Sequence, residues 1–142
     1  MKMTAYLEHA NLTVPDIEAA IAFLKVVEPQ IEVWHDASRE GIYRWAHVGV
    51  GRCYIALQEP HIGSVPRDDR RPYKDFGINH LGWVVPDLDA VIRRLEEGGY
   101  RKGIPGEENP YRKRAYYHDS AGFEWELVEY STERPEERYS YD

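Results

Sequence analysis

The chain has 142 residues, of which 42% are hydrophobic and 13% aromatic, and its formal net charge is -7 at pH 7. This composition excludes a disordered chain and suffices for one compact domain or for two small modules with a shared core. An acidic chain without a basic stripe argues against a nucleic-acid partner, and no apolar run approaches the roughly 20 residues of a membrane span. The N-terminus has no signal-peptide core. We therefore expect a cytoplasmic protein with neither nucleic acid nor a membrane as a partner.

A phrase near the N-terminus is repeated in the second half of the chain. The segment LEHANLTVPDIEAAIAFL at 7–24 aligns without a gap with INHLGWVVPDLDAVIRRL at 78–95, with seven identities that include His9 with His80 and Asp16 with Asp87. A repeat of this length predicts one structural unit that is used twice.

Each copy of the repeat predicts a strand followed by a helix. In 9–14 and 80–85, β-favouring residues alternate, which places each histidine on the polar face of its strand. A proline then disfavours helical geometry in the residue before it, and Asp16 or Asp87 is a good N-cap for the next helix. The helices carry apolar residues at helical spacing, and Gly98-Gly99 predicts the end of the second one.

The remaining elements complete two similar halves. Strand candidates rich in Ile, Val, Trp and Tyr lie at 31–35, 41–48 and 52–58, and in the second half near 100–102, at 112–118 and at 124–130. Prolines and clustered charges in 61–75 indicate a linker, which can also act as a lid over a site. The sequence thus predicts a first βαβββ module at 1–60, this linker, a second βαβββ module at 76–130 and an exposed C-terminal tail at 131–142.

The last strands of the two halves differ at one informative position. With an offset of 70 residues, Ala56 corresponds to Glu126. Glu126 shares a strand face with Glu124, whereas Trp125 and Leu127 alternate on the opposite, apolar face. A carboxylate in a half-apolar strand requires a partner, because burying it unpaired costs free energy.

Three further residues are predicted to have no chemical role. Cys53 is the only cysteine, so it forms no internal disulfide, which agrees with a cytoplasmic location. Its place in an apolar strand predicts a small buried core residue. Trp83, on the strand face opposite to His80, and Trp125 are likewise predicted to lie in the core.

Together these features resemble the vicinal oxygen chelate superfamily, which includes glyoxalase I, fosfomycin-resistance thiol transferases, extradiol dioxygenases and bleomycin-binding proteins. The resemblance rests on the paired modules, the histidine in the first strand of each, the Pro-Asp helix entry and the closing phrase YYHDSAGFEWELVEY. That phrase is similar to the family's aromatic-Asp-Pro-x-Gly-x-x-x-Glu-Leu ending, with Ser120 in place of the common proline. The resemblance implies an α+β fold in which two βαβββ modules form a cupped, half-open barrel, the glyoxalase/bleomycin-resistance-like fold.

The resemblance also implies a metal site. The family's ligand positions fall on His9, His80 and Glu126, and two imidazoles with one carboxylate can hold Zn, Ni, Mn or Fe as a divalent ion with positions left open. The fourth ligand of glyoxalase I would fall on Ala56. Gln58 lies two residues further on the same strand face and is the candidate fourth ligand.

Three more residues are candidates for the site. Tyr116 lies ten residues before Glu126, a spacing at which a family tyrosine reaches the metal cavity, so the resemblance implies that these two residues are catalytic. The phenol can donate a hydrogen bond to a substrate oxygen, or act as an acid or base if the metal lowers its pKa. Tyr116 as a core aromatic is the alternative. Tyr54 and Arg114 are candidate substrate-binding residues, because a guanidinium binds anionic groups in a bidentate manner.

Two functions of different class remain open. The first is a divalent-metal-dependent enzyme that polarises a small oxygenated substrate chelated to the metal, by lyase, thiol-transferase or dioxygenase chemistry. The second is a metal-free small-molecule binding or resistance protein of the bleomycin-binding type. The presence of all three ligand types favours the enzyme, since sequestering proteins of the family generally lack the set. Single chains of the family usually pair, so the resemblance also implies a homodimer.

Overall fold

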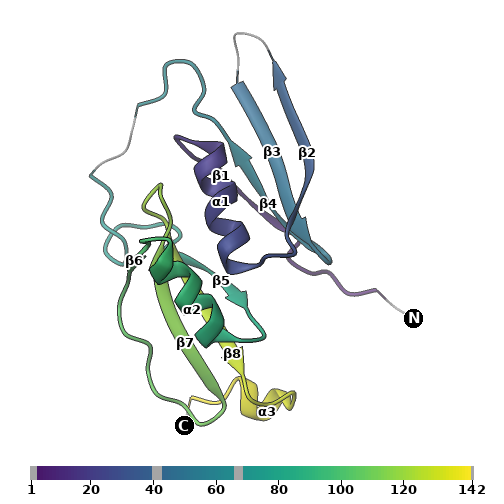
Figure 1. The fold of residues 1–142 in the computed structure, drawn as a ribbon, viewed down its shortest axis with the longest axis vertical. Helices are drawn as coiled ribbons and strands as arrows, with labels where there is room; N and C mark the ends of the chain where they lie inside the picture. Colours follow the sequence, from purple (N-terminus) through teal and green to yellow (C-terminus); the bar gives the residue numbers. More distant parts are fainter. Residues whose placement is uncertain (1–2, 40–42, 66–68, 142) are drawn as a thin grey trace. The chain divides into compact units, whose positions relative to one another are not determined.

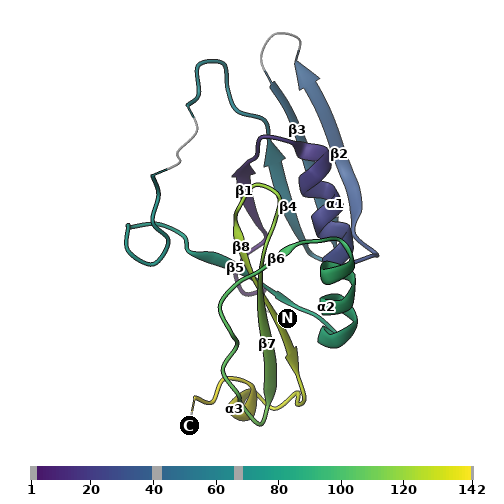
Figure 2. The same cartoon turned by 60° about the vertical axis from the view of Figure 1, so that its left-hand side comes forward.

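The computed structural model describes residues 3–39, 43–65 and 69–141. The chain divides into two compact units, unit 1 with residues 1–25 and 29–66 and unit 2 with residues 26–28 and 67–142. Figures 1 and 2 show one sheet and one longer helix in each. Among the described residues, no helix is long and apolar enough to span a membrane.

Unit 1 is a four-stranded mixed sheet with one helix. Its elements are β1 (His9–Thr13), α1 (Ile17–Val27), β2 (Glu32–Arg39), β3 (Tyr43–Val50) and β4 (Cys53–Gln58). The strand order is β1-β4-β3-β2, with β1 parallel to β4 and the other pairs antiparallel. The predicted order β-α-β-β-β is confirmed. The predicted strand 41–48 begins at residues that lie outside the described ones.

Unit 2 repeats this topology. Its elements are β5 (His80–Val84), α2 (Leu88–Glu97), β6 (Arg101–Lys102), β7 (Arg112–His118), β8 (Glu124–Tyr130) and a short α3 (Pro135–Arg138). The order is β5-β8-β7-β6, with β5 parallel to β8. The fold prediction of two βαβββ modules is therefore correct. The segment predicted as a tail contains α3.

The Pro-Asp motif begins both helices in the way the sequence predicts. Asp16 Oδ1 accepts a hydrogen bond from the Ala19 backbone N–H at 3.0 Å, and Asp87 Oδ1 accepts one from the Ala90 N–H at 2.9 Å. These carboxylates satisfy N–H groups that have no partner within the first helical turn.

In each sheet the alternation of side chains separates an apolar face from a polar one. In unit 2 the buried side chains of α2 pack against the face of β7 and β8 that carries Tyr117, Trp125 and Leu127. In unit 1 the apolar face carries the buried side chains of Ala46, Val48, Ile55 and Leu57. The opposite faces carry His9 in unit 1 and His80 in unit 2. The core prediction for Trp125 is confirmed, since it is 2% exposed, whereas Trp83 is only half-buried.

The core prediction for Cys53 is wrong, because this residue is exposed. Cys53 is the first residue of β4 and pairs with Val50, the last residue of β3, directly at the hairpin turn. Burial begins two residues later, at Ile55. The first residue of an apolar strand is therefore not necessarily buried.

Replacing Cys53 by alanine should consequently change the free energy of unfolding by less than about 0.5 kcal/mol, the usual range for surface substitutions. The native thiol should also react with a chromogenic disulfide reagent without denaturant. Urea titration of both proteins and a thiol assay under native conditions measure this. If the thiol reacts only after unfolding, Cys53 is buried after all.

Candidate functional site

The polar face of the unit 2 sheet brings three predicted site residues together. In the register, Glu126 of β8 lies opposite Tyr116 of β7 on one side and opposite Gly82 of β5 on the other. His80 Nε2 lies 2.9 Å from Glu126 Oε2, and the Tyr116 ring stands edge-on to the His80 ring with centroids 5.6 Å apart.

Glu126 is the carboxylate that the basic side chains of His80 and Arg114 contact on this face. Its side chain is 18% exposed, and Arg114 Nη1 lies 3.8 Å from its Oε1. Burial raises the pKa of Tyr116, and the charge of Glu126 and a hydrogen bond to it add to this effect. Tyr116 therefore keeps its proton and serves as a hydrogen-bond donor.

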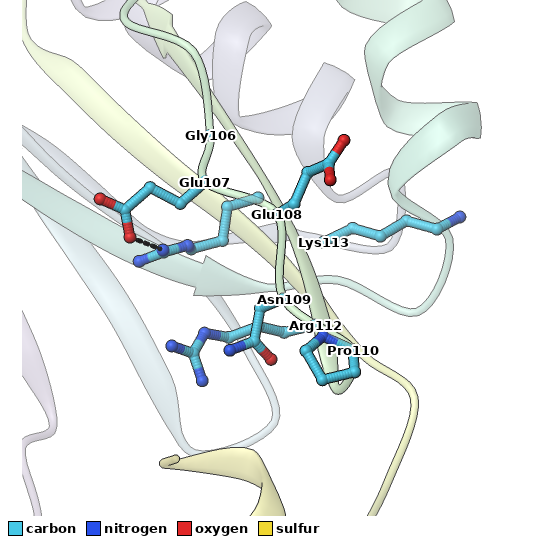
Figure 3. A pocket seen from close by; sticks show the side chains of 8 residues that line it. Gly106, Glu107, Glu108, Asn109, Pro110, Arg112 and Lys113 are labelled. Atoms are coloured by element: carbon cyan, nitrogen blue, oxygen red, sulfur yellow. Dashed lines mark hydrogen bonds and ion pairs between the residues drawn. The ribbon is translucent and has the colours of Figure 1, made fainter. Parts of the chain in front are cut away.

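Arg114 connects this face to a pocket of about 670 Å³ along the loop between β6 and β7, lined by Gly106, Glu107, Glu108, Asn109, Pro110, Arg112, Lys113 and Arg114. Figure 3 shows the carboxylates of Glu107 and Glu108 on opposite sides of this loop. Arg114 Nη2 lies 3.3 Å from a Glu107 oxygen, although Glu107 is largely exposed. The Arg114 side chain itself is only 12% exposed. It is thus a nearly buried cation at the margin of an open pocket, which suits an anionic group of a ligand.

Sequence analysis placed Glu124 on the same face, but it did not predict that Tyr73 contacts this second carboxylate. Glu124 is 8% exposed and accepts a hydrogen bond from the phenol of Tyr73. His118 Nε2 lies 3.6 Å from its Oε2, and the Tyr73 oxygen also lies 3.0 Å from His80 Nδ1. Tyr73 comes from the segment predicted as a linker. No local pattern indicates which strand a loop side chain will contact.

The polar face of unit 1 carries a continuous chain of aromatic and imidazole rings. His9 stacks on Tyr54 with centroids 4.6 Å apart and an interplanar angle of 13°. Tyr54 contacts His47 at 4.8 Å, and His47 contacts His35 at 5.4 Å. Burial lowers the pKa of His47, and the neighbouring His35 and His9 act in the same direction. The chain of rings continues from His35 through Trp45, Tyr43 and His61.

Two of the predicted site residues thus meet in unit 1, and a third lies further along the same strand. His9 and Tyr54 are register partners of β1 and β4. Gln58, the candidate fourth ligand, pairs with Thr13 at the far end of these strands, and its amide nitrogen contacts His61 Nε2.

Within the ranges 3–39, 43–65 and 69–141, no group of three His, Cys, Asp or Glu side chains is close enough to hold a metal ion. Unit 2 does bring together one imidazole nitrogen and one carboxylate oxygen, those of His80 and Glu126. The participation of His9 and Gln58 stays a prediction.

The two modules, each a four-stranded mixed sheet with a helix on one face, define an α+β protein with a glyoxalase-like fold. Residues 8–134 match the model of the Glyoxalase/Bleomycin resistance protein/Dioxygenase superfamily. The chain belongs to this superfamily, as the resemblance in its sequence implied.

Several solved structures share this fold. A glyoxalase family protein from Bacillus cereus is 16% identical, with a TM-score of 0.75 over 91% of this chain and 96% of that one. A glyoxylase/bleomycin resistance protein/dioxygenase domain from Frankia is 22% identical, with a TM-score of 0.69 over 90% and 99%. The fosfomycin resistance protein FosX from Listeria monocytogenes, complexed with Mn(II) and sulfate, is 18% identical, with a TM-score of 0.68 over 97% and 100%. No curated protein matches the sequence significantly.

Proposed function

We propose that this protein is a divalent-metal-dependent enzyme of the vicinal oxygen chelate type, which acts on a small oxygenated substrate. The observation that supports this most is the 2.9 Å approach of His80 Nε2 to Glu126 Oε2 beside Tyr116 on the polar face of the unit 2 sheet. An imidazole nitrogen and a carboxylate oxygen are donors that Zn, Ni, Mn and Fe accept.

The donor atoms of unit 2 fit such an ion. Both the imidazole lone pair and the carboxylate are electron-rich, so a close approach between them requires a proton or a metal ion to balance the charge. His80 and Glu126 would hold the ion, with His9 and Gln58 as the further ligands expected from the sequence. When bound, a divalent ion polarises substrate oxygens as a Lewis acid. The Mn(II) complex of the FosX structure is consistent with this chemistry on a similar fold.

The neighbouring side chains would orient the substrate. Tyr116, whose raised pKa keeps it protonated, would donate a hydrogen bond to a substrate oxygen. Arg114 would bind an anionic group through guanidinium donors that face the pocket side of the sheet. Tyr54, in its stack with His9, would contact an apolar or planar part of the substrate. These roles are common to lyase, thiol-transferase and dioxygenase chemistry.

Two observations favour the alternative, a metal-free small-molecule binding protein of the bleomycin-binding type. Glu126 already has two basic neighbours, His80 and Arg114. The ring-lined face of unit 1 also offers stacking surfaces to a planar ligand, beginning with Trp34, Tyr54 and His9.

Metal analysis of protein purified without a metal-chelating tag separates the two functions. We expect about one equivalent of Mn, Fe, Ni or Zn per site, retained through gel filtration, because a ligand set of three or four protein groups binds such ions tightly. Reconstitution of chelator-treated protein with each ion checks the result. If the protein neither retains nor takes up a divalent ion, the enzyme proposal is wrong and the metal-free binding function remains.

We further propose a homodimer, since single chains of this superfamily usually pair. Multi-angle light scattering should give twice the mass of one chain at micromolar concentration. A mass equal to one chain across the concentration range would contradict the proposal.

A further inference from the structure

Arg114 is a nearly buried cation whose hydrogen-bond donors are incompletely used. Its side chain is 12% exposed, and its Nε is buried without a hydrogen-bond partner in the described part of the chain. Nη2 donates a long hydrogen bond of 3.3 Å to Glu107 Oε2, and Nη1 lies 3.8 Å from Glu126 Oε1. A buried donor without a partner costs free energy, so this arrangement is incomplete.

Glu107 fills half of one edge of the Arg114 guanidinium. Nε and Nη2 form one edge of the planar fork and can bind both oxygens of one oxyanion. Arg44 in unit 1 shows the complete arrangement, with Nε and Nη2 donating to the two oxygens of Asp36 at 3.0 and 2.7 Å. On Arg114, the contact with Glu107 uses Nη2 and leaves Nε unpaired.

The loop that carries Glu107 is fixed against the edge of β7. The Gly103 N–H donates to the Tyr116 carbonyl at 2.6 Å, and a methyl group added at Gly106 would overlap the backbone carbonyl of Arg114. This close approach places the next residue, Glu107, beside the Arg114 side chain. The Glu107 side chain is 84% exposed, so it can leave the guanidinium by rotating into water while the loop stays in place.

The other cations that line this pocket already have partners. Arg112 Nη1 donates to two backbone carbonyls of the C-terminal segment at 2.9 and 2.7 Å. Lys113 alternates to the opposite face of the sheet, where its Nζ lies 3.3 Å from Asp89 of α2. Arg114 is therefore the lining cation that a ligand in the pocket can bind.

We propose that Arg114 binds the oxyanion group of a small ligand, a carboxylate or a phosphate, and that Glu107 is a displaceable competitor for this cation. The inference rests on the proposed function, in which Arg114 binds an anionic group of the substrate. An exposed ion pair such as that of Glu107 contributes little, whereas an oxyanion that fills both Nε and Nη2 makes a bidentate contact. A neutral group cannot replace the Glu107 carboxylate in this way, so Glu107 makes the pocket selective for anionic ligands.

Titration of chelator-treated protein with inorganic phosphate and with acetate tests this inference. Binding is followed through the Arg114 Nε–H signal in ¹H–¹⁵N NMR spectra, which Arg114→Lys identifies by its absence. Glu107→Gln should lower the Kd of the anion by about two- to fivefold, because it removes an exposed ion pair that the anion must otherwise break. The anion with the lower Kd gives the chemical class of the ligand group.

Glu108→Gln is the matched control. It removes the same charge from the other side of the loop (Figure 3), and exposed charges are screened at physiological salt, so the Kd should stay within about 1.5-fold of the parent value. Arg114→Lys keeps the charge but loses the planar fork, so it should weaken binding of either anion, followed by backbone N–H signals of the loop. Circular dichroism confirms that each variant is folded.

The two proposals fail in different ways. Equal Kd values for the parent and Glu107→Gln would show that Glu107 does not compete, and an Nε–H signal that neither anion shifts would remove the oxyanion site. Both results are independent of metal binding, because the titrations use metal-free protein. If the anion binds as expected but the protein takes up no divalent ion, the role of Arg114 and Glu107 stands and the enzyme proposal falls.

Discussion

Replacing His80 by alanine should reduce the affinity for Mn(II) and the other candidate ions by more than 100-fold. This exceeds the roughly 10- to 100-fold effect of losing an outer-shell partner, because His80 would be a direct ligand. Glu126→Gln should have a comparable effect, since it keeps the shape of the side chain and removes the charge that balances the cation. Isothermal titration with each ion, after chelator treatment, measures both.

Matched controls separate ligation from a general loss of histidine or of negative charge. His35→Ala removes an exposed imidazole from unit 1, and Glu108→Gln removes an exposed carboxylate from the loop before β7. Neither should change metal affinity more than twofold. The double variant His9→Ala, His80→Ala should bind no ion, whereas Gln58→Ala should weaken binding only modestly if Gln58 is a peripheral ligand. Parental affinity in the double variant would remove the basis of the enzyme proposal.

Replacing Asp119 by alanine should lower the free energy of unfolding by about 2–4 kcal/mol, since each buried donor left without a partner costs about 1–3 kcal/mol. Asp119 lies in the turn between β7 and β8. Its Oδ1 accepts from the backbone N–H groups of Ala121 and Phe123, and its Oδ2 accepts from Trp125 Nε1, each at 2.9 Å. The Trp125 side chain is fully buried.

Urea unfolding followed by tryptophan fluorescence measures the effect. Asp119→Asn retains one acceptor oxygen. Its free energy of unfolding should therefore lie between those of the parent and Asp119→Ala. Asp89→Ala is the control, because Asp89 is an exposed carboxylate whose ion pair with Lys113 is solvated and adds little to stability. Equal midpoints for Asp119→Ala and Asp89→Ala would show that this turn does not anchor Trp125.

The site residues that sequence analysis identified are those whose positions follow from local geometry. A period of two along a strand places His9 and His80 on the polar faces and Trp125 in the core, and this alternation holds wherever one face of a sheet is buried. The repeat predicted that the same βαβββ order occurs twice. Tyr116 and Glu126 share a face for the same reason, and the antiparallel register sets them side by side.

The sequence by itself therefore determined the two modules, their helix starts and the faces on which the candidate ligands lie. Only the tertiary structure decided the exposure of Cys53 at a hairpin turn, the chain of rings across four strands of unit 1 and the contact of Tyr73 with Glu124 and His80. These features depend on where a hairpin turns, on the register between strands and on the path of a loop. Such properties arise from contacts between residues far apart in the chain, whereas the alternation of side chains along one strand is set by the backbone of that strand alone.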